Sequence, residues 1–375
     1  MRRLLTIGHS YVIAGNRRLA HEMALQGRGT WEVTAAAPER LAADLRAVTL
    51  EPIADEACAL CPLAVRFATT PHLRFYDRRL RSLMSSSWDV VHVWEEPYVA
   101  ACAQIAALAP GRARVVPATF QNIVKTYPPP FGFLERQVIG RSAGWIAFGS
   151  TAADAQRSKP PYAAKPSRVI PPGVDVARYR PDREARRDVR ARLGWDESVP
   201  VVGYLGRFVP EKGLALLMRA LDAVAAPWRA LFVGGGAMEK DLQAFADRHP
   251  GRVRILTDVV HDGVPAYLNA MDLLCAPSQT TPRWREQFGR MLIEAMACGV
   301  PIVASNSGEI PHVVGDAGAL VAEDAEGEWT AAITALAGDC GRRRELGARG
   351  RERAHDRYAW PVVARAHLAF FEELM

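Results

Sequence analysis

The sequence predicts an α/β protein built from two doubly wound parallel sheets, because short apolar runs alternate with amphipathic, alanine- and arginine-rich segments throughout. Its 375 residues exceed the usual size of one hydrophobic core, so two domains are expected. Apolar residues make up 49% and charged residues 23%. That balance is typical of a globular protein and excludes the disordered and fibrous classes.

The apolar runs expected to be strands fall into two groups along the chain. They are residues 3–7, 31–36, 89–93, 114–118, 145–148 and 168–170 in the first half, and 201–205, 229–233, 253–256, 272–276 and 302–304 in the second. Between the halves, Pro171-Pro172-Gly173 and the charged, apolar-poor stretch 178–190 are typical of an interdomain crossing.

We therefore expect one domain over residues 1–173 and a second over 174–357, with a last segment, 358–375, that contains an amphipathic helix over 360–374. In doubly wound sheets, ligands bind outside the carboxyl ends of the strands. Two such domains facing each other across a cleft would place a ligand between them.

The formal charge of +6 favours anionic partners, and no nucleic-acid reader motif accompanies the arginines. The densest basic stretch, 66–81, also carries aromatic and leucine side chains, so it is either a docking segment for an anionic membrane or a solvated basic helix. No run approaches the roughly 20 apolar residues that cross a bilayer. The six cysteines lack the spacing of a disulfide scaffold or a zinc site. A cytoplasmic protein without a metal, peripheral to the membrane at most, is expected.

The loop 206–213 follows an apolar strand and precedes the helix expected over 214–225. Arg207 and Lys212 stand five positions apart in it. Such a loop suits a diphosphate, because arginine binds oxygens in a bidentate manner and lysine adds a point charge. If the phosphate leaves, both cations would stabilise the negative charge that develops. The alternative is a surface turn with two solvated cations.

Glu286 and Glu294 bracket the start of a helix that Gly289 opens and that Gly299 ends. The first amides of this helix form a natural anion site. The two glutamates are separated by a loop and look in different directions, so they cannot act as an acid/base pair on one helical face. Two acceptors around an anion site suit a ligand with hydroxyls at both ends and phosphate in the middle, which is the shape of a sugar nucleotide.

These motifs resemble the retaining glycosyltransferases of family 4 (group 1), which have the GT-B fold of two Rossmann-like domains. That family carries two glutamates with seven residues between them, followed by a run like the one over 295–304. Further matches are Gly173-Val174-Asp175, the 206–213 loop, Gly234-Gly235-Gly236 and the stretch 272–278. The resemblance covers nearly the whole second half, and the motifs occur in the right order.

The resemblance implies a role for each matching position. Arg207 and Lys212 would bind the donor diphosphate, Glu294 the ribose and Glu286 a hydroxyl of the transferred sugar. It also implies no cofactor or metal, and a last helix that returns to the first domain. Further donor contacts would come from the residues of the base-binding segment and of the helix start: Val259, Val260, Phe288, Gly289, Arg290 and Met291.

The first half departs from the family pattern. A histidine often follows the strand that here reads 114–118, whereas this chain has Gln121 and Asn122 nearby. Neither can be a general base, and His9, after the first strand, is the nearest substitute by position. In a front-face mechanism the departing phosphate itself can accept the proton of the acceptor. Asn16 and Lys125 complete the candidate acceptor side.

Two other classes of function remain. A nicotinamide-dependent oxidoreductase would need a Gly-x-Gly-x-x-Gly motif in the first turn, which has only Gly15. A non-catalytic sugar-nucleotide-binding or scaffold protein is the second alternative, motivated by Gln121 and Asn122. The sequence identifies neither the sugar, the base nor the hydroxyl acceptor, which can be a glycan, a lipid-linked molecule or a small molecule.

Overall fold

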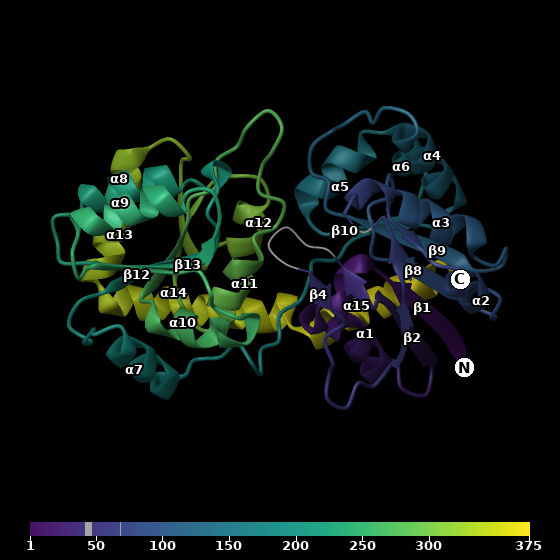
Figure 1. Cartoon of the computed structure of the whole chain (residues 1–375), viewed down its shortest axis with the longest axis horizontal. Helices are drawn as coiled ribbons and strands as arrows, with labels where there is room; N and C mark the ends of the chain where they lie inside the picture. Colours follow the sequence, from purple (N-terminus) through teal and green to yellow (C-terminus); the bar gives the residue numbers. More distant parts are fainter. Residues whose placement is uncertain (42–46, 68) are drawn as a thin grey trace. The chain divides into compact units, whose positions relative to one another are not determined.

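Two parallel sheets organise two separate units in the computed structural model, which describes residues 1–41, 47–67 and 69–375. The first unit comprises Met1–Gly173 and Trp360–Met375, and the second comprises Val174–Ala359 (Figure 1).

The sheet of the first unit has the strand order β11-β10-β9-β8-β1-β2-β5, with parallel pairing throughout. Its strands are β1 (Arg2–Ile7), β2 (Trp31–Pro38), β5 (Ala59–Leu63), β8 (Val90–Val93), β9 (Arg114–Thr119), β10 (Trp145–Ala147) and β11 (Ser167–Val169). Two short antiparallel ribbons accompany it, β3 (Arg40–Leu41) with β4 (Val48–Thr49) and β6 (Val65–Arg66) with β7 (Phe75–Tyr76).

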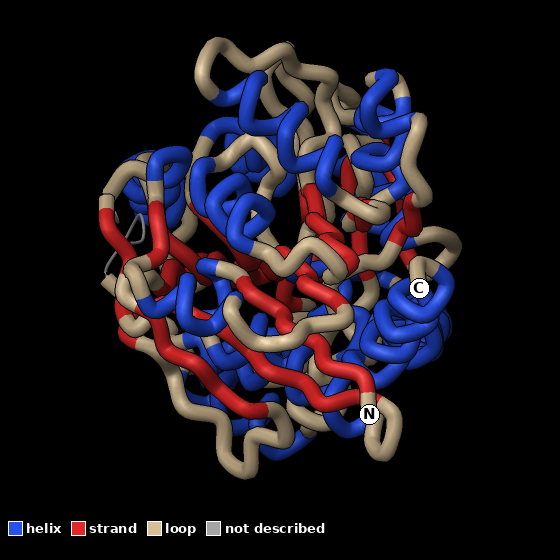
Figure 2. The backbone as a smooth tube through the Cα atoms, turned by 90° about the vertical axis from the view of Figure 1, so that its right-hand side faces the viewer, coloured by secondary structure: helices blue, strands red, loops and turns tan. Residues whose placement is uncertain are grey.

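Helices cover this sheet, and the last helix of the chain is among them. The helices are α1 (Ala14–Gln26), α2 (Arg79–Met84), α3 (Ala100–Leu108), α4 (Phe131–Arg141), α5 (Ser150–Arg157), α6 (Pro160–Ala163) and α15 (Trp360–Glu373), with short 3-10 turns η1 (His9–Val12) and η2 (Pro71–Leu73). The helix predicted over 360–374 is thus confirmed as α15. It packs on α1, and Phe371 meets the edge of Trp31 with 6.4 Å between ring centroids. Both chain termini lie on this unit (Figure 2).

The sheet of the second unit has the order β14-β13-β12-β15-β16-β17, again parallel. Its strands are β12 (Val201–Arg207), β13 (Arg229–Gly235), β14 (Val253–Leu256), β15 (Leu273–Ala276), β16 (Ile302–Ser305) and β17 (Gly318–Val321). Its helices are α7 (Arg183–Arg192), α8 (Leu214–Asp222), α9 (Glu239–Arg248), α10 (Val264–Ala270), α11 (Arg290–Ala297), α12 (Ile310–Val314), α13 (Glu326–Gly338) and α14 (Cys340–Arg353), with short turns η3 (Pro210–Lys212), η4 (His261–Gly263) and the π-turn η5 (Ala354–Tyr358).

The predicted strands lie within one or two residues of the observed ones, but the sequence does not predict the two-residue strands of the ribbons, or β5 and β17 of the two sheets. Both are edge strands with half-exposed residues, and Pro62 and Gly318 interrupt their apolar patterns. The charged stretch expected to cross between domains is largely a helix, α7, of the second unit. Asp182 caps its N-terminus by accepting from the amides of Glu184 and Ala185, and that cap starts the helix despite the few apolar residues.

Each strand order reverses at one place, and that place positions the functional loops. In the second unit β13 and β14 extend to one side of β12, whereas β15 lies on its other side. In the first unit β2 and β8 flank β1 in the same way. The loops that leave β12 and β15 therefore lie next to each other at the reversal, as do those that leave β1 and β8. Such switch points are where doubly wound sheets bind ligands.

Gly213 allows the loops after β12 and β15 to approach closely. Its φ of 73° lies in the left-handed region, and a Cβ there would stand 1.8 Å from the carbonyl oxygen of Pro277. The amide of Gln279 also donates to the carbonyl of Glu211 over 2.8 Å. The two loops thus pack against each other at the carboxyl ends of β12 and β15.

Substituting Gly213 with alanine is expected to destabilise the protein by about 2 kcal/mol or more, because the left-handed backbone and the Pro277 contact both oppose a Cβ. The matched control is Gly327→Ala in α13, where a Cβ meets nothing within 4 Å. Thermal unfolding would show a lower midpoint for the first variant and an unchanged or higher one for the control. Equal midpoints for the two variants would contradict this account of the loop.

Candidate functional site

A buried ion pair joins the two loops at the switch point of the second unit. Lys212 Nζ lies 2.5 Å from Glu286 Oε2, and the two side chains are only 13% and 7% exposed. The hydroxyl of Ser278 donates to the same oxygen over 2.8 Å. The ammonium also lies 5.0 Å from the centroid of the Trp284 ring. Charges held this far from water keep a fixed geometry, because moving either one would leave the other unpaired.

The backbone of Glu286 is held from the opposite side by the loop after β16. The amide of Glu309 donates to the carbonyl of Glu286 over 3.0 Å, and a Cβ on Gly308 would stand 2.0 Å from that oxygen. Glu286 therefore connects the ends of three strands, β12, β15 and β16. The sequence predicted separate ligand-binding roles for Lys212 and Glu286, and the structure brings them into direct contact.

Arg207 ends β12 beside this pair, and its side chain is exposed. Within the described residues its guanidinium makes no ion pair. Burial raises the pKa of the Tyr204 phenol, the charge of Glu286 adds to that shift, and the charge of Arg207 opposes it. The charges of Arg207 and Glu286 thus both act on the buried Tyr204 hydroxyl. The exposed Arg207 and the buried Lys212–Glu286 pair therefore both lie at the carboxyl ends of the strands.

Helix α11 begins at the same edge and carries Glu294 into the core. Gly289 precedes it with a φ of 79°, a conformation that glycine adopts without strain. The first amides of the helix have no acceptor within it and can bind an anion. Glu294 is 7% exposed. Burial raises the pKa of Glu294, and the charges of Arg290 and Arg178 oppose that rise. Phe288 and Met291 pack into the surrounding core.

Arg178 is a functional candidate that the sequence did not indicate. Its guanidinium donates to the carbonyl of His261 over 2.7 Å, and its charge acts on Glu294. It thereby links the buried carboxylate to the segment that contains Val259 and Val260. Val259 packs on the core, whereas Val260 is 55% exposed. The only sequence signal was its position just after Gly173-Val174-Asp175.

The switch point of the first unit carries a second carboxylate cluster. Glu95, in the loop after β8, accepts from the amide of His9 over 2.6 Å and also contacts His9 Nδ1. The Tyr76 hydroxyl donates to the same carboxylate over 3.1 Å. Burial lowers the pKa of His9, but the charge of Glu95 and the hydrogen bond to it outweigh burial, so this pKa lies above its usual value. Glu95 was not singled out in the sequence.

Glu96 anchors the loop that contains Gln121 and Asn122. Its carboxyl accepts from Thr119 Oγ1 and from the amide of Phe120, each over 2.7 Å. Burial raises the pKa of Glu96 to about 7. Gln121 bonds the hydroxyl of Tyr127, and both Gln121 and Asn122 are buried.

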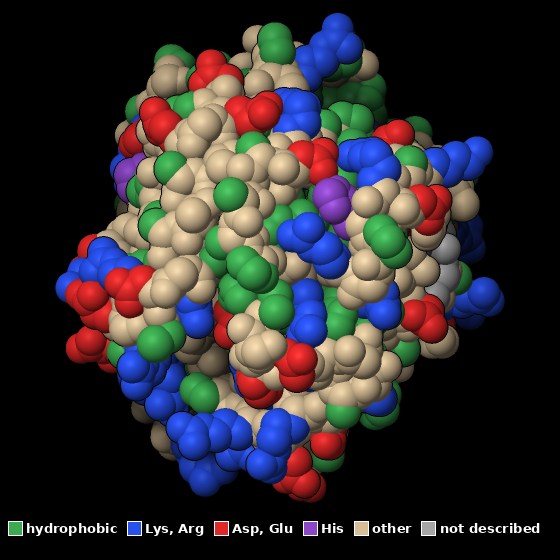
Figure 3. All heavy atoms as spheres, turned by 90° about the vertical axis from the view of Figure 1, so that its left-hand side faces the viewer, with side chains coloured by type: hydrophobic (Ala, Val, Ile, Leu, Met, Phe, Trp, Pro, Cys, Tyr) green, Lys and Arg blue, Asp and Glu red, His purple; other side chains and the backbone are tan. Residues whose placement is uncertain are grey.

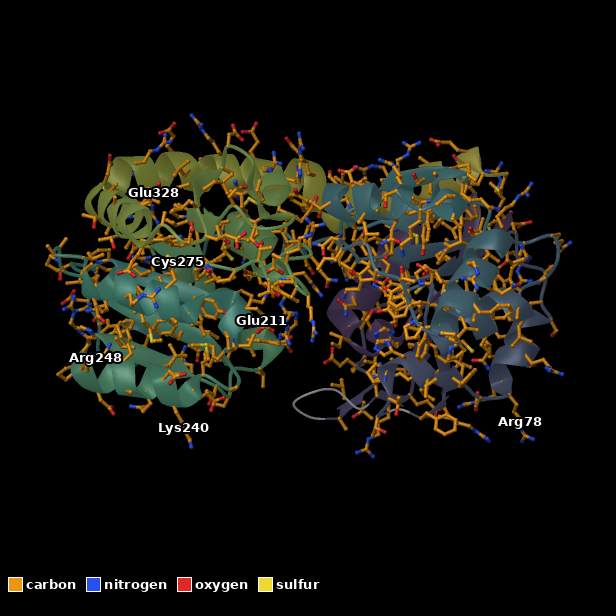
Figure 4. The ribbon with its side chains drawn as sticks, turned by 90° about the horizontal axis from the view of Figure 1, so that it is seen from above. Arg78, Glu211, Lys240, Arg248, Cys275 and Glu328 are labelled. Atoms are coloured by element: carbon orange, nitrogen blue, oxygen red, sulfur yellow. The ribbon has the colours of Figure 1, made fainter. Side chains whose placement is uncertain are left out.

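The other candidates of the first unit differ in their surroundings. The Asn16 amide donates to the carbonyl of Ser10 over 3.0 Å, and the half-buried Lys125 has no side-chain partner within the described residues. His92 is buried and bonds Thr6, so it supports the core. Among the described residues of the basic stretch 66–81, α2 provides the α-helical part and η2 a 3-10 turn. Arg78 projects outward from it, whereas Cys275 on β15 lies inside the second unit (Figure 4).

The fold and these sites define an α/β protein of two Rossmann-like units with a candidate site at each switch point. Residues 199–339 match the family described as glycosyl transferases group 1. The GDP-mannose-dependent alpha-(1-6)-phosphatidylinositol monomannoside mannosyltransferase of Mycolicibacterium smegmatis is 33% identical over 286 residues, which cover 72% of this chain and 74% of that protein. The chain belongs to the group 1 glycosyltransferases.

A second relative agrees with this membership, and solved structures share the fold. The D-inositol 3-phosphate glycosyltransferase of Segniliparus rotundus is 34% identical over 252 residues, 63% of this chain, and the chain spans about half, 54%, of that protein. Sucrose-phosphate synthase from Thermosynechococcus elongatus has a TM-score of 0.73 at 20% identity, covering 100% of this chain and 99% of that one. Anabaena Alr3699/HepE in complex with UDP has a TM-score of 0.73 at 19% identity, covering 100% of both. These structures show that the fold is the predicted GT-B fold.

The raised pKa of Glu96 predicts a pH dependence of stability. Its carboxyl takes up a proton near pH 7 in the folded state and near pH 4.5 when unfolded. The folded state therefore binds more protons between these values, so stability falls by about 3 kcal/mol as the pH rises from 4.5 to 7. In urea titrations across this range, Glu96→Gln should remove that part of the decline. Parallel declines for the variant and the natural chain would show that Glu96 does not titrate there.

Proposed function

We propose that this chain transfers a sugar from a nucleoside diphosphate sugar to a hydroxyl acceptor, with retention of anomeric configuration and without a divalent metal. The observation that carries the proposal is the edge formed by Arg207 and the Lys212–Glu286 pair at the switch point of the second unit. An exposed guanidinium beside a fixed ammonium suits the diphosphate of a donor. A carboxylate 2.5 Å from that ammonium suits a sugar hydroxyl next to it.

The bond between the anomeric carbon and the diphosphate oxygen breaks as the bond to the acceptor oxygen forms. The acceptor proton passes to the departing diphosphate. Arg207, Lys212 and the first amides of α11, from Gly289 to Met291, stabilise the charge that develops on the leaving group. These cations supply the neutralisation for which other transferases use a metal.

The rest of the donor fits the remaining features of this edge. Glu294, buried below the helix start, accepts from the ribose hydroxyls. Arg178 holds the segment of Val259 and Val260, against which the base lies. The M. smegmatis relative is described as GDP-mannose-dependent, whereas the Anabaena structure holds UDP. The shared chemistry is a nucleoside diphosphate.

The acceptor contacts come from the first unit. His9, fixed by Glu95, meets the acceptor hydroxyl and can hold its proton before transfer to the phosphate. Lys125 and Asn16 lie on the same unit, and Gln121 and Asn122 shape the neighbouring loop. The partners are thus a nucleotide sugar and a hydroxyl-bearing acceptor.

Donor hydrolysis tests the reaction without a known acceptor. A panel of nucleoside diphosphate sugars should yield free nucleoside diphosphate in EDTA as fast as without it. Arg207→Gln should lower kcat/KM by about 100-fold at an unchanged unfolding midpoint, because it removes one stabilising cation from an exposed position. Lys240→Gln, at an exposed lysine on α9, is the control and should retain activity. Tight donor binding with no turnover for any donor would favour the scaffold alternative instead.

We also propose that the first unit rests on an anionic membrane surface through residues 66–81. Phe67, Leu73 and Phe75 are exposed by 66%, 41% and 38%. Phe67 has a φ of 55°, which is rare for a bulky residue, and it begins a turn in which its carbonyl accepts from the amide of Thr70. The exposed Arg66, Arg78 and Arg81 complement anionic headgroups. No helix among the described residues has the length and apolar character to span a bilayer.

Co-sedimentation with vesicles that contain anionic lipid tests this surface. The natural chain should bind at low salt and detach at high salt, because exposed charges are screened. Arg78→Glu with Arg81→Glu should abolish binding. The control pair, Arg28→Glu with Arg112→Glu, makes the same charge change at exposed positions outside the stretch and should bind less strongly than the natural chain but still measurably. Absence of binding by the natural chain at low salt would exclude the proposal.

A further inference from the structure

A hollow of about 600 Å³ lies at the amino ends of the strands of the second sheet, whereas the candidate donor site lies at their carboxyl ends. Its wall contains the residues that enter β15 and β16, Met271-Asp272 and Val300-Pro301, and the beginnings of α7 and α14. The strands of this sheet have four to seven residues, so their amino and carboxyl ends are about 13–23 Å apart. The hollow is therefore a distinct place on the same unit.

The two carboxylates of this wall are already engaged. Asp272 accepts from Arg186, Arg190 and the amide of Val201. Asp182 caps α7 through the amides of Glu184 and Ala185. Asp272 is therefore neutralised by its two arginines, and Asp182 forms no ion pair with the remaining arginines of the hollow among the described residues.

Three guanidiniums of the wall have no carboxylate partner among the described residues: Arg183, Arg343 and Arg344. Arg343 is held in place by hydrogen bonds of 2.6 Å to the carbonyls of Leu336 and Ala337. Arg344 bonds only Cys340 of its own helix. Figure 3, which shows the side of the second unit that lies on the left in Figure 1, has basic side chains along its lower part, at the level of α7. Like charges around a concave surface reinforce one another and concentrate anions there.

We propose that this hollow binds a small phosphorylated molecule with at least two negative charges. Guanidiniums bind phosphate oxygens in a bidentate manner, and three of them converge on this hollow. The volume lies within the range of small-molecule sites, so the ligand can carry an organic group beside its phosphates. The site is independent of the donor edge and would make the second unit responsive to a second anion.

Cys340 provides a reporter for this site alone. It lines the hollow, and it is the one exposed cysteine of the six in the chain. A bound anion would shield its thiol. The rate at which N-ethylmaleimide labels Cys340, followed by peptide mass spectrometry, therefore measures occupancy without interference from pyrophosphate bound at the donor edge.

We expect inorganic pyrophosphate to slow labelling of Cys340 several-fold at low salt, relative to sodium chloride of equal ionic strength. Arg183→Gln with Arg344→Gln should abolish the protection at an unchanged unfolding midpoint. The matched control is Arg187→Gln with Arg351→Gln, which removes the same charge from exposed positions on the same two helices. In this variant pyrophosphate should still protect Cys340.

The phosphate could belong to a soluble molecule or to a lipid headgroup. Repeating the labelling experiment with vesicles that contain phosphoinositide distinguishes these two sources. Protection by pyrophosphate supports a soluble ligand, whereas protection by vesicles alone overturns the soluble ligand and identifies a lipid headgroup. No protection by either probe, or equal protection in the Arg183/Arg344 variant, overturns the site.

Discussion

The ion pair between Lys212 and Glu286 is the interaction on which the candidate donor site depends. It spans two loops that leave neighbouring strands in the same direction, and the loop after β16 fixes Glu286 from behind. The first unit repeats the arrangement with different chemistry, since His9 after β1 meets Glu95 after β8. In both units a carboxylate with little exposure orients a group of opposite charge or basic character. The parallel sheet supplies the positions, because its strand order reverses beneath each pair.

The balance of charge differs between the two edges in a way that suits different ligands. At the second-unit edge Arg207 remains without an ion pair among the described residues, so the edge favours an anion. At the first-unit edge the carboxylates of Glu95 and Glu96 lie behind a histidine, so the edge favours a neutral group with a proton to give. A sugar nucleotide and a hydroxyl acceptor have these complementary properties.

The sequence predicted most of the central strands and helix α11, because buried parallel strands and a helix bounded by glycines leave strong local patterns. It did not predict β5 and β17, whose edge positions leave them half-exposed, or α7, which is held by its cap and by the bonds of Arg186 and Arg190 to Asp272. Motif spacing indicated the residue types that the structure brings together at the candidate donor site. Motif spacing did not indicate the pairing of His9 with Glu95, 86 positions apart, or the hydrogen bond of Arg178 to His261. Long-range pairing depends on the register of the sheet, which local patterns do not encode.

The position of α15 affects how the chain matures during synthesis. The first unit needs Trp360–Glu373 to cover α1, but those residues follow the whole second unit in the chain. From Gly173 to Trp360 the ribosome must add 360 − 173 = 187 residues, which takes on the order of 10–40 s. During that interval the apolar face around Trp31 lacks its cover, whereas the second unit can complete itself from contiguous chain. The first unit thus begins to be synthesised before the second unit but completes its fold after it.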